Sequence, residues 1–91
     1  MKVGQIFVSS KFEKQFKKLP LKIRKKAVKT QILFSEDPFH PSLRLHKLKG
    51  KFEGAWSISM DMKYRIIFKP KKRGEILFVS IGQHAIYEQN F

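Results

Sequence analysis

The stretch from residue 56 to residue 81 constrains the fold most, because apolar side chains recur in it with the period of two that a strand requires. Its clearest piece is Tyr64-Arg65-Ile66-Ile67-Phe68, whose β-branched and aromatic residues are typical of a sheet strand. Residues 61–63 and 70–74 have the composition of turns. We therefore predict an antiparallel meander of three strands over this stretch.

The first half of the chain predicts one short strand and two helices. Residues 3–8 are expected to form the strand. Ser10, with Glu13 three positions later, predicts an N-cap and capping box for the first helix. Pro20 separates this helix from a second one, predicted from about Leu21 to Phe34. The apolar residues of the second helix that we expect to be buried are Ile23, Ala27, Val28, Ile32 and Phe34.

The predicted fold class is α+β, with an N-terminal strand and a two-helix hairpin packed on a small antiparallel β-meander. The length of 91 residues suits a single domain with one core of modest size, spanning residues 1–91. The N-terminal segment does not have the composition of a signal peptide, and no run is long enough for a membrane span. The sequence has no cysteine, which excludes disulfides and thiol catalysis and is compatible with the cytoplasm, the location we expect.

Strand parity sorts the meander into two faces, because neighbouring residues of a strand point to opposite sides. The face expected to pack on the helices comprises Trp56, Ile58, Met60, Tyr64, Ile66, Phe68, Leu77, Val79 and Ile81. The other face is half polar and is expected to form an open surface, comprising Ser57, Ser59, Arg65, Ile67, Lys69, Phe78, Ser80 and His84. Arg65 and His84 share this second face. A guanidinium and an imidazole together can bind a phosphate and move a proton.

The net charge of the chain predicts a polyanionic partner. Twenty Lys and Arg residues stand against seven Asp and Glu residues, a balance of +13 that destabilises the compact state by self-repulsion. Nucleic acid is favoured over an anionic membrane or an acidic protein, because a small domain of such strong basicity is its usual electrostatic footprint. The three histidines and few acids have no metal-ligand spacing, so we expect no metal and no other cofactor.

The order of these segments carries a resemblance to a known family. The pieces that carry it are Leu45-His46-Lys47-Leu48-Lys49-Gly50, Trp56-Ser57-Ile58, the strand from Tyr64 to Phe68, and Ile81-Gly82-Gln83-His84-Ala85-Ile86-Tyr87. In this order and at these spacings, nearly the whole chain resembles the RelE/ParE superfamily of toxins from bacterial and archaeal type II toxin–antitoxin modules. The resemblance implies the RelE-like fold. It also implies a metal-independent endoribonuclease, an mRNA interferase, that cuts message in the ribosomal A site by attack of a 2′-hydroxyl on the adjacent phosphate.

The same resemblance assigns roles to single residues. Arg65 matches a strand arginine that contacts the scissile phosphate, and His84 matches a phosphate ligand or proton-transfer group. Tyr87 resembles an aromatic residue that stacks on a base or orients the phosphate, and His46 or Lys49 is the candidate base. The candidate RNA contacts are Lys25, Lys47, Lys49 and Lys69. The implied partners are the ribosome with its mRNA and a cognate antitoxin that holds the toxin inactive.

Departures from the family pattern leave other interpretations open. Ser57 and Ser59 stand where RelE presents catalytic lysines, so the chain is closer to the histidine-using members. A ParE-type inhibitor of DNA gyrase without nuclease activity, or a non-catalytic RNA-binding member of the same fold, would also fit. For Arg65, the structural alternative is an ordinary ion pair with Asp61 or Glu75, which would contribute about 0–1 kcal/mol.

Overall fold

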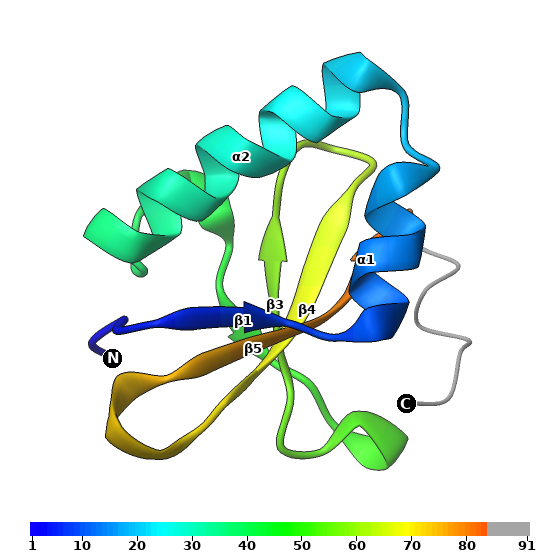
Figure 1. Cartoon of the computed structure of the whole chain (residues 1–91). Coiled ribbons are helices and arrows are strands. Elements are labelled where there is room, and N and C mark those ends of the chain that lie inside the picture. Colours follow the sequence, from blue (N-terminus) through cyan, green and yellow to red (C-terminus); the bar gives the residue numbers. More distant parts are fainter. Residues whose placement is uncertain (84–91) are drawn as a thin grey trace.

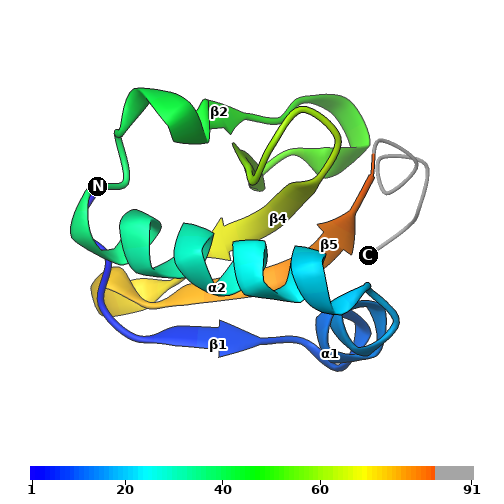
Figure 2. The ribbon, with the colours of Figure 1, turned by 90° about the horizontal axis from the view of Figure 1, so that it is seen from above.

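The computed structural model describes residues 1–83 and has the α+β fold that the sequence predicts. The two helices lie on one side of a five-stranded sheet (Figures 1 and 2). The elements are β1 (Ile6–Val8), α1 (Ser10–Lys17), α2 (Leu21–Glu36), β2 (His46–Lys47), β3 (Trp56–Ser59), β4 (Arg65–Pro70) and β5 (Ile76–Gly82), with single 3-10 turns η1 (Pro41–Leu43), η2 (Gly50–Phe52) and η3 (Lys72–Gly74). None of the helices within residues 1–83 has the length and apolar character needed to cross a membrane.

The sheet has the strand order β1-β5-β4-β3-β2. The meander of β3, β4 and β5 is antiparallel, as predicted, and the two-residue β2 adds an antiparallel edge. The N-terminal strand is shorter than predicted and pairs in parallel with β5, Ile6 lying opposite Ile76. This parallel pairing is possible because the two helices carry the chain away from β1 before the meander begins.

A layer of phenylalanines joins the helices to the sheet. The ring of Phe34 on α2 lies 4.9 Å from that of Phe68 on β4 and 6.1 Å from that of Phe78 on β5, measured between centroids. Phe12 of α1 reaches the same layer, 5.5 Å from Phe78. Phe34 and Phe68 are fully buried. Aromatic pairs at these separations add about 0.5–1.5 kcal/mol each beyond their area burial, so this layer is the main contact between the two layers of the fold.

Two apolar residues of α2 that were expected to be buried are exposed. Ala27, Thr30 and Phe34 form the buried stripe of the helix. Val28 and Ile32 point away from this stripe, Ile32 almost to the opposite side of the helix, and remain 48% and 53% exposed. The expectation was wrong because the helix turns by about 100° per residue, and the stripe that includes Phe34 directs these two side chains away from the sheet.

A β-bulge in β5 reverses part of the predicted parity. Ile67 of β4 pairs with Ser80, whereas the next residue, Phe68, pairs with Phe78, so that Val79 has no partner in the ladder. On the far side of this extra residue, Phe78 joins the core cluster beneath the helices and Leu77 does not. The predicted faces of Leu77 and Phe78 were therefore wrong, because the extra residue Val79 shifts the alternation of side chains along β5 by one position.

Ser9, and not Ser10, caps the first helix. Ser9 has extended backbone angles, and its Oγ accepts a hydrogen bond of 3.0 Å from the N–H of Phe12. The same hydroxyl donates a 2.8 Å hydrogen bond to the carbonyl of Val79, the bulged residue. Ser10 is already the first helical residue, so the predicted cap was off by one position and the predicted capping box with Glu13 does not form, because the residue three after Ser9 is Phe12. One hydroxyl thus both starts α1 and attaches it to the bulge.

We expect Ser9→Ala to lower the free energy of unfolding by about 1–2 kcal/mol, because it removes both the helix cap and the bond to the bulge. Ser10→Ala is the matched control, since Ser10 is exposed and neighbours Ser9; its change should stay within about 0.5 kcal/mol. Urea unfolding followed by circular dichroism measures both. Equal losses in the two variants would show that Ser9 has no special role.

Candidate functional site

Arg65 opens β4 and lies at one end of the central pairing of the sheet. It pairs with Ser59 of β3 and with Gly82 of β5. The side chain is half-buried, and its Nη1 donates to the carbonyls of Asp61 at 2.7 Å and of Tyr64 at 3.3 Å. These bonds hold the guanidinium over the β3–β4 turn. Its Nε and Nη2 atoms make no hydrogen bond within residues 1–83, so they can still donate to a ligand.

The structural alternative for Arg65, an ion pair with Asp61 or Glu75, does not occur. The carboxylate of Asp61 is bound elsewhere, since Oδ1 accepts from the N–H groups of Lys63 and Tyr64, each at 2.8 Å, and Oδ2 lies 3.0 Å from Nζ of Lys26. Glu75 comes just before Ile76, which pairs with Pro70 at the end of β4. Arg65 is at the opposite end of β4, so the two side chains are far apart. Arg65 bonds to the backbone of Asp61 and keeps an unpaired charge within the described part of the chain.

His46 of β2 belongs to the same face of the sheet as Arg65. It lies opposite Ser57, which lies opposite Ile67, and Ile67 is two residues beyond Arg65 on β4. With strands about 4.8 Å apart and a rise of about 3.3 Å per residue, the Cα atoms of His46 and Arg65 are roughly 12 Å apart. His46 is exposed, and its Nδ1 lies 3.1 Å from the carbonyl of Arg44. Since a carbonyl can only accept, Nδ1 carries the proton, which leaves Nε2 of a neutral imidazole free to accept one.

The face that Arg65 and His46 share is not the open surface that parity predicted. Ser57, Ile67 and Ser80 are fully buried in its middle. A second apolar cluster of Leu48, Ala55 and Ile67, with Phe52 of η2 against it, covers part of this face. The expectation was wrong because the polarity of a serine does not reveal what covers it: residues 48–55 pack on Ile67, and the hydroxyl of Ser80 donates to Oε1 of Gln15 on α1 at 3.0 Å. The candidate site therefore lies at the margin of this face.

The four predicted RNA-contacting lysines do not form one patch. Lys47 and Lys49 are exposed, at and just after β2, and Lys47 lies opposite Trp56 and so points to the other face of the strand from His46. Lys69 is half-buried on β4, and Lys25 is exposed on α2, which belongs to the other layer. Two further predicted site residues, His84 and Tyr87, lie outside the described residues. Within residues 1–83, no three His, Cys, Asp or Glu side chains come together as a metal site requires.

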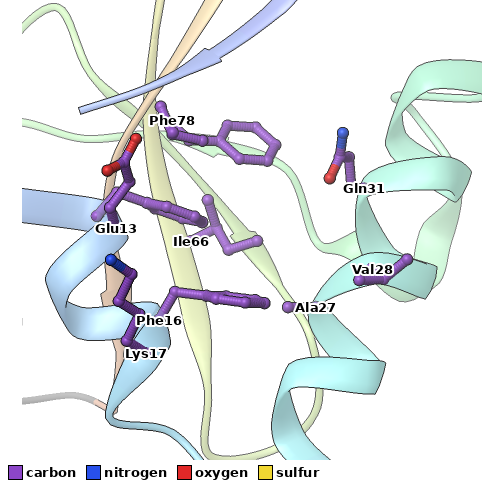
Figure 3. A pocket seen from close by; sticks show the side chains of 10 residues that line it. Glu13, Phe16, Lys17, Ala27, Val28, Gln31, Ile66 and Phe78 are labelled. Carbon is purple, nitrogen blue, oxygen red and sulfur yellow. The ribbon is translucent and has the colours of Figure 1, made fainter. Parts of the chain in front are cut away.

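An apolar groove opens between the two helices. It has a volume of about 240 Å³, and the side chains that line it include Val8, Phe12, Phe16, Ala27, Val28 and Phe78. Figure 3 shows Phe16 pointing from α1 toward Ala27 of α2, with Glu13 and Lys17 on the α1 side. Val8 and Val28 are 41% and 48% exposed in the isolated chain. Apolar side chains that remain this exposed around a groove are typical of an interaction site.

The arrangement of the elements defines a class of protein: the chain has the RelE-like fold of small toxins, as the resemblance predicted. In particular, it superposes on YafQ from Escherichia coli BL21(DE3) with a TM-score of 0.77 and 18% identity, over 93% of this chain and 98% of YafQ. A YoeB/ParE toxin from Agrobacterium tumefaciens superposes with a TM-score of 0.75 and 14% identity, over 89% of this chain and 99% of that toxin. The RelBE2 toxin–antitoxin complex from Mycobacterium tuberculosis gives a TM-score of 0.73 and 16% identity, over 88% of this chain and 96% of the matched one. No protein-family model and no curated protein matches the sequence.

The sequence did not single out the network around Asp61. It predicted residues 61–63 as a tight connection, and an Asp at the start of such a turn often accepts hydrogen bonds from the next N–H groups. The bond from Lys26 could not be foreseen, because it joins residues 35 positions apart. Partial burial raises the pKa of the Asp61 carboxyl, but the N–H groups of Tyr64 and Lys63 and the ammonium of Lys26 lower it more. The pKa therefore lies below its ordinary value of 3.8.

The lowered pKa of Asp61 makes stability depend on acidity. Because the folded state favours the carboxylate, its stabilisation is present above the ordinary pKa and is lost as the pH falls through the folded pKa, below about pH 4. Asp61→Asn should therefore show a smaller loss of unfolding free energy between about pH 4 and about pH 2, by on the order of 0.5–1 kcal/mol. Asp37→Asn, at an exposed aspartate, is the control and should keep the native slope. The same slope in all three proteins, measured by urea unfolding, would contradict the role given to Asp61.

Proposed function

We propose that this protein is the toxin of a type II toxin–antitoxin module and acts in the cytoplasm as a metal-independent mRNA interferase on the ribosome. The observation that carries the proposal is Arg65. On a RelE-like fold, this arginine has no charge partner within residues 1–83 and two donor nitrogens without a bond there, at the margin of the sheet face that His46 shares. A fixed guanidinium of this kind suits the charge that develops on a phosphate in the transition state.

In the proposed reaction, the 2′-hydroxyl of the message attacks the adjacent phosphorus, and the bond from phosphorus to the 5′-oxygen breaks. Nε and Nη2 of Arg65 donate to the non-bridging oxygens. Nε2 of His46 takes the proton of the 2′-hydroxyl, a role supported by the bond of its Nδ1 to the carbonyl of Arg44, and Lys49 is the other candidate base. His84 gives a proton to the leaving oxygen, and Tyr87 orients the phosphate or stacks on a base.

Basic side chains supply the affinity for RNA in this proposal. Lys47 and Lys49 are exposed beside His46, and Lys25 and Lys69 are further contacts from other elements. The net charge of +13 supports long-range attraction to the ribosome and its message. Contacts of this kind position an RNA backbone and carry no sequence information.

A cognate antitoxin is the second proposed partner. Several of the similar structures are toxin–antitoxin complexes, among them Escherichia coli DinJ–YafQ at a TM-score of 0.73 and YoeB–YefM from Staphylococcus aureus at 0.71. For this chain, an apolar segment of the antitoxin would fill the groove between α1 and α2. Exposed Val8 and Val28 line that groove, and Lys17 on its α1 side suits an acidic neighbour.

Inhibition of DNA gyrase without nuclease activity is a second candidate function. The strand on which RelE presents lysines carries Ser57 and Ser59 here, and both are buried, at 0% and 7% exposure. Neither hydroxyl can reach a substrate, so β3 contributes no catalytic group. Inhibited supercoiling together with intact mRNA would favour this candidate over the interferase.

Arg65→Ala should lower the rate of mRNA cutting by about 100-fold or more, because the transition-state charge loses its main donor. Primer extension on message translated with the purified protein measures the cuts. Arg65→Lys keeps the positive charge but cannot donate the two parallel hydrogen bonds of a guanidinium. Its cutting rate should therefore lie between those of Arg65→Ala and the unaltered protein. Lys72→Ala, in the exposed η3 turn, is the control and should cut normally. Full cutting by a folded Arg65→Ala protein would refute the assignment.

Val28→Lys should weaken binding of the antitoxin encoded beside this gene by about tenfold or more, because the new ammonium would have to be buried in the groove. Leu21→Lys is the matched control. It adds the same charge to the same helix at a residue that is 59% exposed and outside the groove. Isothermal titration calorimetry compares the two affinities. Equal affinities for both variants would move the antitoxin to another surface.

A further inference from the structure

A second concave site lies beside the β3–β4 turn. It is separate from the groove between the helices, with which it shares no lining residue. It is a cleft of about 580 Å³, open to solvent, between the first turns of α2 and the turn that follows β3. The side chains that the argument needs are Lys22, Ile23, Lys26, Lys63, Tyr64 and Gln83. The volume falls within the range of about 300–1,000 Å³ that is usual for sites of small organic ligands.

The charges of the cleft do not cancel. Asp61 neutralises Lys26 at 3.0 Å, and its other carboxylate oxygen is occupied by two backbone N–H groups of the turn. The ammonium groups of Lys22 and Lys63 have no hydrogen-bond or ion-pair partner within the described part of the chain. Two uncompensated positive charges therefore face one cleft, and they suit an anion.

Neutral groups add hydrogen-bond donors and an apolar wall. Nε2 of Gln83 donates to the hydroxyl of Tyr64 at 3.1 Å, so the phenol oxygen accepts this bond and its own proton remains free to donate. Ile23 and Met62 line the same cleft, and Met62 is 80% exposed. An inorganic anion would use only the charged part of this site. A ligand with a phosphate and a partly apolar body would use all of it.

We propose that this cleft binds one phosphodiester group of an RNA strand, with Lys22, Lys63 and the hydroxyl of Tyr64 on the phosphate oxygens and the nucleoside against Ile23 and Met62. The proposal rests on the proposed function and deepens it, because Asp61 and Tyr64, which line the cleft, also accept hydrogen bonds from Arg65 through their carbonyls. The carbonyl of Asp61 holds the guanidinium, while its carboxylate holds Lys26 in the wall of the cleft. A strand whose scissile phosphate lies at Arg65 thus meets the cleft with a neighbouring nucleotide.

The test compares two double variants that each remove two positive charges. Lys22→Gln/Lys63→Gln empties the cleft of its free ammonium groups. Lys71→Gln/Lys72→Gln changes exposed residues after the opposite end of β4 and is the control. The probe is a short, labelled, single-stranded 2′-O-methyl RNA, which cannot be cut because it lacks the attacking hydroxyl. Fluorescence anisotropy gives its affinity over a series of salt concentrations, and thermal unfolding confirms that both variants are folded.

The cleft variant should bind the RNA about tenfold more weakly and should lower the slope of log K against log salt by about 0.7, the value for one lost phosphate contact on a single strand. The control should change the slope by less than about 0.3 if its lysines do not touch the strand. In NMR titrations of the unaltered protein, the side-chain amide of Gln83 should shift on addition of the RNA. Equal losses in both variants, no saturable binding by the unaltered protein, or an unshifted Gln83 amide would each overturn the proposal.

Two further experiments distinguish RNA binding in the cleft from binding of an acidic protein segment, and distinguish failure of the cleft proposal from failure of the interferase proposal. A polyglutamate peptide that shifts the Gln83 amide at lower concentration than the RNA does would assign the cleft to an acidic protein segment and overturn the RNA assignment. Cutting of translated mRNA is measured on the same variants. If the unaltered protein cuts mRNA but both variants bind alike, the cleft proposal fails and the interferase stands. If it binds RNA through the cleft but cuts nothing, the interferase fails and the cleft stands.

Discussion

The contact of Phe34 with Phe68 and Phe78 is the interaction on which the rest of the structure depends. It joins α2 to the two central strands and so determines which residues of the helix meet the sheet. The bulge in β5 makes the contact possible, because without the extra residue Val79 the ring of Phe78 would point away from the helices. The position that this contact gives to α2 also leaves Val28 exposed in the groove between the two helices.

The turn around Asp61 connects this core to the chemistry of the surface. Since α2 lies across the sheet, Lys26 reaches the carboxylate of Asp61, while the carbonyl of the same residue holds Arg65. One residue thereby orients the candidate phosphate-binding guanidinium and forms part of the cleft that Lys22 and Lys63 line. The Coulomb energy of the exposed pair is small, about 0–1 kcal/mol, so its importance lies in positioning and not in stability.

Local patterns predicted the elements well and their packing poorly. The alternation in residues 56–81 identified the meander, because strand period and turn composition are properties of neighbouring residues. The helix cap was predicted at Ser10 but is Ser9. Either serine can accept the capping hydrogen bond, and only the observed backbone angles decide between them. The open face was predicted from Ser57 and Ser80, yet both are buried, and the hydroxyl of Ser80 donates to Gln15 of α1. Sequence polarity does not show which distant segment covers a residue.

The sequence by itself determined the α+β class, the order of the elements, the strong positive charge and the strand arginine, because each of these follows from composition or from short-range periodicity. Only the tertiary structure decided that Arg65 bonds to a backbone carbonyl and has no charge partner among residues 1–83, and that Lys22, Lys63 and Gln83 line one cleft. These are contacts between residues far apart in the chain. They depend on how α2 crosses the sheet and on a one-residue bulge, and no local pattern encodes either.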